Sequence, residues 1–320
     1  MIGPRDIEAA RRRLQGVALR TPLVPCPRSE QGRALYFKPE SLQPTGAFKL
    51  RGAYNKISSL SPEDRRRGVV AHSSGNHAQA VAYAARVLET RAVVLMPRGA
   101  SRVKLDATAE LGAEVVLVGP GSAERSREAD ELAEEHGYVP VPPYDDEVLV
   151  AGQGTIGAEI LEDLPDVGTV LVPVSGGGLI GGISAAIKSA RPDVRVIGVE
   201  PELAADARAS LESGRLVEFP ADQVARTVAD GLRVQKLGEA PFEHIRAFVD
   251  DIVAVSEEEI LEAMRRLALR VRLVAEPSGA VTFAAYLFHR EELPTSRLTV
   301  AVISGGNVEP GLLAEVLSRR

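Results

Sequence analysis

Lys49 is the residue whose type and setting best suit covalent chemistry. Pro44 and Gly46 oppose a helix before it, and the apolar pattern reaching Ile57 predicts a helix that begins around Ala47. Lys49 therefore falls in the first turn of this helix, where the positive end of the helix dipole disfavours an ammonium group. Such a setting lowers the pKa of a lysine, as amine nucleophiles and Schiff-base lysines require.

A glycine-rich turn at residues 175–182 has the composition of a phosphate-binding turn. It follows a predicted strand at 169–174 and opens a predicted helix at 180–190. Glycines let the backbone approach an anion closely, and the free N–H groups at a helix start point toward it. The turn therefore predicts a site for a phosphate group.

The spacing of these glycines leaves the cofactor open. Gly176, Gly178 and Gly181 satisfy the G-x-G-x-x-G pattern of dinucleotide-binding turns, and Glu200 ends the next predicted strand. In a nicotinamide enzyme, a carboxylate about 20 residues after the turn holds the ribose. A nicotinamide-dependent oxidoreductase is therefore an alternative to an enzyme with another phosphate-bearing cofactor.

Two more strand-to-helix turns carry small polar side chains. Residues 73–77 read Ser-Ser-Gly-Asn-His, and residues 303–307 read Ile-Ser-Gly-Gly-Asn. Hydroxyls, amides and free N–H groups at a helix start suit a small anion such as a carboxylate. The same residues also serve as ordinary helix caps, so these turns alone do not establish a site.

The elements that would position these turns alternate between β-branched runs and alanine-rich helical periods. This alternation is typical of parallel sheets covered by helices, and it predicts two open α/β domains with a cleft between them. The proline-rich stretch 139–146 is interpreted as a linker, and 208–236 carries no clear period. Strands are predicted at 69–72, 92–96, 114–118, 169–174, 194–199 and 298–303, and helices at 77–88, 102–111, 123–136, 180–190 and 257–273.

Composition indicates a globular enzyme acting on a small molecule. The 320 residues include 38 Lys and Arg against 44 Asp and Glu, a net charge of −6, which argues against a nucleic-acid partner. The most apolar stretch, 169–187, is too interrupted by glycines and a proline to cross a membrane. Cys26 is the single cysteine, so no intrachain disulfide is possible, and we expect a cytoplasmic protein.

The segment from Ser41 to Ala53 resembles the Ser-Leu-Gln-x-Thr-Gly-x-Phe-Lys-x-Arg-Gly-Ala signature of the serine/threonine dehydratase and serine racemase family. The three polar turns recur in the same order, and the similarity runs from about residue 6 to 317. The resemblance implies a fold type II pyridoxal-phosphate enzyme, similar to the tryptophan synthase β chain, with two open twisted α/β domains and the active site in their cleft. It also implies a large cofactor-binding domain (1–45 plus 143–320), a small mobile substrate-binding domain (46–142) and a homodimer.

The resemblance assigns roles to individual residues. Lys49 would hold pyridoxal 5′-phosphate as a Schiff base and move protons at the substrate Cα, while Phe48 would pack on the pyridine ring. Asn76 would bind the phenolic oxygen, and Ser304 would face the pyridine nitrogen. The phosphate would be bound by N–H groups of Gly176, Gly177, Gly178 and Leu179, and the substrate carboxylate by Ser73, Ser74, Asn76 and His77.

The family also has a divalent-cation site, which Glu200, Asp206 and the carbonyl of Ala204 match in spacing. Oxygen ligands of this kind suit Mg²⁺, Ca²⁺ or Mn²⁺. Solvated acids after a strand are the alternative reading. Asp230 and Glu276 lie in further segments that resemble the family's active-site walls, with either a structural or a functional role.

The resemblance implies β-elimination from L-threonine and L-serine, giving a 2-oxo acid and ammonia. Lys49 and Ser74 would lie on opposite faces of the substrate, which also permits racemisation. A serine racemase and a 3-hydroxyaspartate dehydratase are the alternatives within the family. The nicotinamide-dependent oxidoreductase is the alternative outside it.

Overall fold

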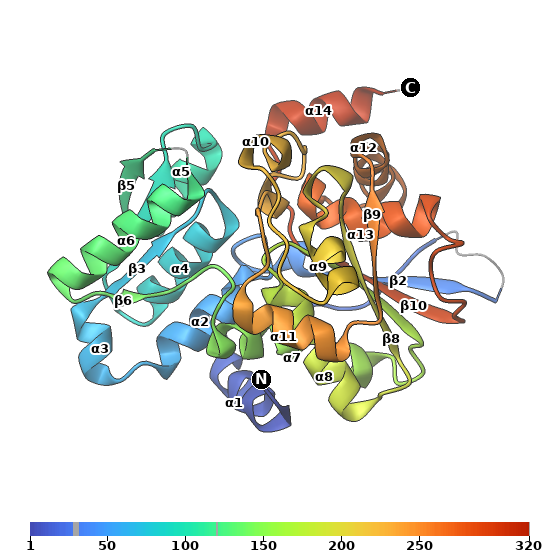
Figure 1. The fold of residues 1–320 in the computed structure, drawn as a ribbon, viewed down its shortest axis with the longest axis horizontal. Helices are drawn as coiled ribbons and strands as arrows, with labels where there is room; N and C mark the ends of the chain where they lie inside the picture. The colour runs from blue at the N-terminus through green and yellow to red at the C-terminus, as the bar shows by residue number, and fades with distance from the viewer. Residues whose placement is uncertain (28–31, 120, 320) are drawn as a thin grey trace.

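The computed structural model describes residues 1–27, 32–119 and 121–319. Its strands form two separate sheets, one of six strands and one of four, each covered by helices (Figure 1). The predicted fold class, two open α/β units, is confirmed. The exact domain boundaries stay a prediction.

The six-stranded sheet has the order β1-β2-β10-β7-β8-β9. All its neighbouring strands are parallel except β1 and β2, which form an antiparallel edge. Its central strands are buried on both faces and rich in Val and Ile, as parallel sheets between helices require. The strands are β1 (Val24–Pro25), β2 (Ala34–Pro39), β7 (Thr169–Pro173), β8 (Arg195–Pro201), β9 (Asp251–Val255) and β10 (Leu298–Ile303).

The four-stranded sheet has the order β5-β4-β3-β6 and is parallel throughout. Its helices lie on the left of Figure 1, while the six-stranded sheet and its helices fill the right. The strands are β3 (Val69–His72), β4 (Ala92–Pro97), β5 (Glu114–Val118) and β6 (Val139–Pro140).

Helices connect the parallel strands and cover both sheets. Around the four-stranded sheet lie α2 (Lys49–Ser59), α3 (Pro62–Arg67), α4 (Asn76–Val87), α5 (Arg102–Glu110) and α6 (Ser122–His136). The other helices are α1 (Pro4–Leu14), α7 (Glu147–Asp163), α8 (Gly178–Ala190), α9 (Asp206–Ser213), α10 (Ala221–Val224), α11 (Glu239–Phe248), α12 (Glu257–Arg266), α13 (Pro277–Phe288) and α14 (Pro310–Ser318). Short turns of helix lie at η1 (Glu40–Leu42), η2 (Glu202–Ala204), η3 (Asp230–Leu232) and η4 (Leu267–Val271).

The linker interpretation of 139–146 is wrong at its start. Val139 and Pro140 form strand β6, which pairs with Val69 and Val70 of β3. A proline is tolerated there because β6 is an edge strand, so its missing N–H costs the sheet no hydrogen bond.

The predicted helix 257–273 is also too long. Helix α12 ends at Arg266, and the chain continues as the π-helical turn η4. It stops at Arg272, whose φ of 66° is left-handed. The stretch without a clear period, 208–236, consists of short elements, which gives it no sustained pattern to read.

The carboxyl ends of three parallel strands lead directly into the three polar turns. Strand β3 ends before Ser73, β7 before the glycine-rich turn, and β10 before Ser304. Ligands of open α/β sheets bind at the carboxyl ends of the strands, so this topology sets the place of the site.

Candidate active site

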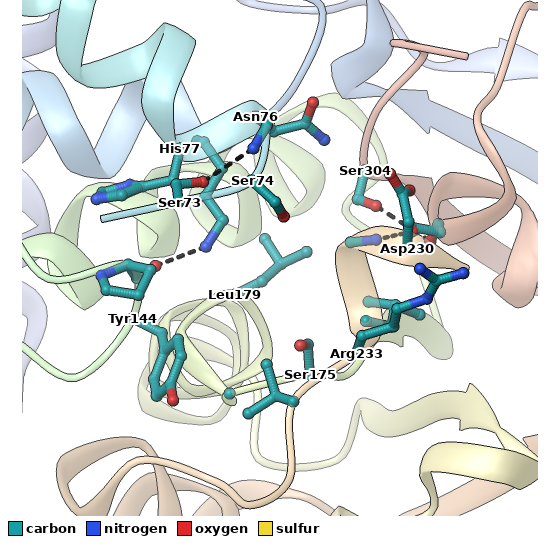
Figure 2. Close-up of a pocket in the computed structure, with 18 of the residues that line it drawn as sticks. Ser73, Ser74, Asn76, His77, Tyr144, Ser175, Leu179, Asp230, Arg233 and Ser304 are labelled. Atoms are coloured by element: carbon teal, nitrogen blue, oxygen red, sulfur yellow. Dashed lines mark hydrogen bonds between the residues drawn. The ribbon is translucent and has the colours of Figure 1, made fainter. Parts of the chain in front are cut away.

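A pocket between the two units gathers the predicted cofactor and substrate residues (Figure 2). Its volume is about 1080 Å³ including the mouth that opens to solvent. The predicted residues that line it are Phe48, Lys49, Ser73, Ser74, Asn76, His77, Gly176, Gly177, Gly178, Leu179 and Ser304. Asp230 and Glu276 line it too, which favours the functional reading of both. The structure thus brings these residues together, while their individual roles stay predictions.

Lys49 is the first residue of α2, so it occupies the first helical turn as predicted. The residue is half-buried, and its Nζ donates a hydrogen bond of 2.5 Å to the carbonyl oxygen of Pro143 and lies 5.2 Å from the ring centroid of Phe48. Burial in the pocket lowers the pKa of Lys49 to about 8. Near neutral pH a useful fraction of this amine is therefore uncharged and able to accept a proton.

A buried network of charged side chains holds α2 in place at Arg51, two residues after Lys49. The Arg51 guanidinium donates to both carboxylate oxygens of Glu40 (2.8 and 2.9 Å) and to both of Glu159 (2.6 and 2.9 Å). Lys38 donates to Glu159 as well, at 2.6 Å. Arg51 and Lys38 hold the pKa of Glu40 below its usual value although burial opposes this. These contacts tie α2 to η1, β2 and α7 and so fix the position of Lys49 at the start of α2.

The glycines of the turn are required for three different reasons. A Cβ at Gly176 would lie 2.3 Å from Cγ of Tyr144, and one at Gly178 would lie 3.2 Å from the Tyr144 backbone oxygen. Gly177 has a φ of 89°, a left-handed conformation that favours glycine.

The same turn presents unfilled hydrogen-bond donors. Within the described chain, the N–H groups of residues 176–179 have no acceptor, because α8 supplies none to its first turn. Unpaired donors at a helix start suit a phosphate group. The turn therefore fits the predicted phosphate site.

The loop 73–77 begins α4 at Asn76 and is held in a tight bend. Ser73 Oγ accepts from the N–H of Gly75 at 3.1 Å, and a Cβ at Gly75 would lie 2.7 Å from Cδ of Lys104. His77 points its ring away from the pocket and Nε2 lies 2.9 Å from the carbonyl oxygen of Val141. Burial, with the charge of Lys49, lowers the pKa of His77 to about 3. Its imidazole is therefore neutral, and we expect His77 to reach a carboxylate through its backbone N–H.

Asn76 joins the two units across the pocket. Its Nδ2 donates to Glu276 Oε1 at 2.5 Å, and its Oδ1 accepts from Nδ2 of Asn307 at 2.8 Å. Lys104 crosses the same gap, forming an ion pair with Asp230 and lying 4.0 Å from Glu276 Oε2. Burial raises the pKa of Glu276 to about 7, although Lys104 opposes the rise. A carboxyl group close to half-protonated at neutral pH therefore lies in the site wall.

Ser304 lies at the end of β10 on the opposite wall. Its buried Oγ donates to the carbonyl oxygen of Ser278 at 3.3 Å, and its own carbonyl accepts from the N–H of Phe48 at 3.0 Å. This backbone contact links the wall directly to the start of α2.

Glu200, Ala204 and Asp206 lie outside the pocket, at the end of β8, in η2 and at the start of α9. The Glu200 carboxylate accepts from the N–H groups of Ala207 (3.2 Å) and Arg208 (2.8 Å). Burial and the charge of Asp206 raise the pKa of Glu200 well above its usual value, and burial raises that of Asp206 to about 7.

Two buried carboxylates without a cation repel one another, and Asp206 Oδ2 has no hydrogen-bond partner in the described chain. This set therefore fits a divalent cation. The described residues contain no cluster of three or more His, Cys, Asp or Glu side chains arranged for a metal, so carbonyl or water oxygens would have to complete the shell.

Five titratable residues that line the pocket were not predicted as site residues from the sequence: His72, Lys104, Arg125, Tyr144 and Arg233. Lys104 and Arg125 lie on exposed-looking helices whose charges give no sign of which one faces the cleft. Tyr144 lies in the stretch interpreted as a linker. The one sequence feature that could have indicated Tyr144 as a pocket residue is an aromatic side chain between prolines and acidic residues in a stretch of this kind.

Comparisons with known proteins show the family to which the chain belongs. The sequence matches the pyridoxal-phosphate dependent enzyme family over residues 14–305. It is 45% identical to the L-threonine ammonia-lyase of Thermotoga maritima, covering all of this chain and 79% of that protein. It is 43% identical to the catabolic L-threonine dehydratase of Escherichia coli K12, covering 97% of this chain and 94% of that protein.

A solved structure, that of maize serine racemase, superposes with a TM-score of 0.93 at 35% identity and covers 98% of this chain and 96% of its own. No helix in the described residues is long and apolar enough to span a membrane. The family match decides between the two cofactors left open by the glycine spacing, in favour of pyridoxal phosphate. The chain belongs to the serine/threonine dehydratase and serine racemase family of pyridoxal-phosphate-dependent enzymes.

Proposed function

We propose that the protein is an ammonia-lyase that converts L-threonine and L-serine to a 2-oxo acid and ammonia. One observation carries this proposal: a single pocket holds the lysine amine, with its lowered pKa, together with the unfilled N–H donors of the glycine turn. The relatives named for threonine deamination support the substrate class.

The residues present fit the cofactor. Pyridoxal phosphate supplies an aldehyde that condenses with amines and a ring that delocalises electrons released at the substrate Cα. The N–H groups of residues 176–179 would hold its phosphate, and Lys49 would hold its aldehyde carbon. Phe48 would pack on its ring and Asn76 would donate to its phenolic oxygen.

Ser304 would face the ring nitrogen with a hydroxyl that carries no charge. Such a group does not stabilise a protonated ring nitrogen as an aspartate would, so the ring withdraws electrons less strongly. This favours prompt loss of a β-hydroxyl over a long-lived carbanion.

The chain's own residues then bind the substrate and move its proton. The start of α4 offers the N–H groups of residues 76–78 to the substrate carboxylate, beside the hydroxyls of Ser73 and Ser74. The Lys49 amine takes the proton from Cα. The electron pair of the broken Cα–H bond forms the Cα–Cβ double bond as the Cβ–O bond breaks, and the hydroxyl leaves as water with a proton that the phosphate of the bound cofactor would supply. Hydrolysis of the released enamine gives the 2-oxo acid and ammonia.

We further propose that Glu200, Asp206 and the Ala204 carbonyl bind Mg²⁺, Ca²⁺ or Mn²⁺, because the buried carboxylate pair lacks a counter-charge. We also propose a homodimer, which light scattering during gel filtration tests. The predicted division into domains 1–45 plus 143–320 and 46–142 is proposed on the membership of the two sheets.

A substrate panel tests the function. Cofactor-saturated protein is given L-threonine, L-serine or L-threo-3-hydroxyaspartate, and ammonia, 2-oxo acid and D-serine are measured. We expect equal amounts of ammonia and 2-oxo acid from threonine and serine, with little D-serine. Dominant D-serine would establish the racemase, fastest turnover of hydroxyaspartate would establish that dehydratase, and absence of ammonia from all three would overturn the proposal.

A further inference from the structure

The turn 143–146, between β6 and α7, supplies the hydrogen-bond acceptor of the catalytic amine. The carbonyl oxygen of Pro143 receives the hydrogen bond from Lys49 Nζ. A proline carbonyl has no paired N–H in its own residue and its backbone φ is restricted, so its direction depends on how the following residues are anchored.

Two of those residues are anchored by polar contacts. The Asp145 carboxylate accepts from the first N–H groups of α11, those of Glu239 and Ala240, each at 3.0 Å. The Asp146 carboxylate accepts from the N–H of Leu149 at 2.9 Å and pairs with Lys56 at 2.5 Å. Both contacts hold the far end of the turn, next to the helices.

Tyr144, the residue next to Pro143, is anchored by packing. Its ring lies so close to Gly176 that a Cβ there would come within 2.5 Å of three ring atoms. Figure 2 shows the hydroxyl directed away from the Ser73–His77 loop, so the ring rather than the hydroxyl contacts the glycine turn. The turn that holds the amine and the turn that offers the phosphate donors are therefore in direct contact.

We propose that Tyr144 is a positioning residue, whose ring on Gly176 holds the Pro143 carbonyl against the amine of Lys49. The inference rests on the proposed function for its consequence in turnover, but the contact itself can be tested on the protein without cofactor. On this proposal, the segment that the sequence analysis interpreted as a linker positions the amine that moves the substrate proton.

The surroundings of Lys49 explain why this contact matters. Among the described residues, the charged or titratable groups that line its pocket come from several elements: His72 from β3, His77 from α4, Lys104 from α5, Arg125 from α6, Asp230 and Arg233 in and after η3, Glu276 before α13, and Tyr144 itself. The lowered pKa of Lys49 arises from burial, not from any of these charges. Releasing the turn would remove the Pro143 carbonyl, which favours the ammonium, and would also admit water to the amine. Because burial is the cause of the lowered pKa, the net change would be a rise toward the usual value of about 10.4.

The effect on proton transfer follows from this shift. With a pKa of about 8, half of the amine is neutral at pH 8. A rise to about 10 would leave about one hundredth of it neutral, a loss of about 50-fold at that pH.

The test compares Tyr144→Ala with Tyr144→Phe, using Tyr138→Ala as the matched control. Tyr138 is a buried tyrosine of the other unit, whose ring packs beside Gly68. The pKa of Lys49 is measured on the cofactor-free protein from the pH dependence of its acetylation by acetic anhydride, read by peptide mass spectrometry. In parallel, the acid limb of kcat for L-threonine is recorded on the loaded enzyme.

We expect Tyr144→Ala to raise the Lys49 pKa by at least one unit and to move the acid limb of kcat upward with it. Tyr144→Phe should keep the wild-type values, and Tyr138→Ala should change thermal stability without changing either pKa. An unchanged Lys49 pKa in folded Tyr144→Ala, or an equal shift in Tyr138→Ala, would overturn the inference. If Tyr144→Ala raises the Lys49 pKa measured by acetylation but the loaded wild-type enzyme turns over no amino acid, the contact is upheld and the proposed function is rejected.

Gly176→Ala gives an independent route if Tyr144→Ala does not fold. The added Cβ would displace the ring of an unmodified Tyr144, so the Lys49 pKa should rise in this variant too. The leucine side chain of Tyr144→Leu is not planar and can move aside. Adding Gly176→Ala to Tyr144→Leu should therefore raise the Lys49 pKa less than Gly176→Ala does in the wild-type protein. Equal shifts in both backgrounds would contradict the packing argument.

Discussion

Replacing Arg51 by methionine tests whether the buried charge network positions the start of α2. Methionine keeps much of the length of the side chain but removes the donors that Glu40 and Glu159 accept from. Lys38 stays near both carboxylates, but of the two it donates to that of Glu159, and its other acceptor is the carbonyl oxygen of Thr21. Among the described residues, Glu40 would keep Thr21 and Gln43 as its side-chain donors.

The expected cost is large because the network is fully buried. Removing one partner of a buried ion pair destabilises a protein by about 3–5 kcal/mol. With an unfolding entropy of about 2.1 cal/mol/K per residue, cooperative unfolding of all 320 residues would lose about 4–8 °C in Tm.

The loss should also depend on pH. In the wild type the pKa of Glu40 is lowered, so its contribution to stability is present above the pKa of the unfolded chain and is lost as pH falls through the folded value. Without Arg51, burial would instead raise the Glu40 pKa, and the penalty would disappear once the carboxyl is protonated. We therefore expect a larger loss of Tm at pH 8 than at pH 5.

Arg20→Met is the matched control for this experiment. Arg20 also binds two carboxylates, Glu162 at 2.6 Å and Asp163 at 2.5 Å, but its side chain is 46% exposed. Exposed pairs contribute about 1 kcal/mol at most, so its Tm should fall by less than about 2 °C. Equal losses for Arg51→Met and Arg20→Met, or a loss for Arg51→Met that is the same at both pH values, would refute the reasoning.

Three further predictions concern the site. Ser74→Ala should abolish any D-serine formation while keeping most of the ammonia release from L-serine, and equal loss of both would contradict a two-face arrangement. Lys104→Met keeps the stem over Gly75 but leaves Asp230 without this ion pair, so KM for L-threonine should rise about 10-fold with a smaller change in kcat; an unchanged KM would show that the pair does not hold the two pocket walls together. Adding Mg²⁺ to chelator-treated protein should raise Tm by an amount equivalent to about 2.7 kcal/mol at 100 times the Kd, whereas Asp206→Asn should not respond and should be at least as stable as wild type in chelator. A response of Asp206→Asn equal to that of the wild type would reject this cation site.

Local patterns carried most of the fold and the main parts of the site. The strands at Val69–His72 and Glu114–Val118 have the predicted bounds because β-branched runs between turn residues are strong signals. The glycine turn was readable because it combines a strand end, a helix start and free N–H groups, and the Lys49 segment because a lysine follows helix-breaking residues at the start of a helix. The family match confirms the fold class and the cofactor.

Contacts between distant segments could not be predicted from the sequence. Gly176 was interpreted as clearance for an anion, yet the structure shows that the ring of Tyr144 requires it as well. Lys104 reaches Asp230 across 126 positions of the chain, and such a pairing has no local pattern. The prolines at 140, 142 and 143 suggested a linker because an edge strand this short has no period.

The central claim is that the amine of Lys49 holds the cofactor covalently, and reductive trapping tests it most directly. Protein saturated with pyridoxal phosphate is treated with borohydride, digested, and mapped by mass spectrometry beside a Lys49→Ala control. The account predicts one phosphopyridoxyl adduct, on Lys49, and loss of the yellow colour on reduction. An adduct on another lysine, or none at all in saturated wild-type protein, would contradict it.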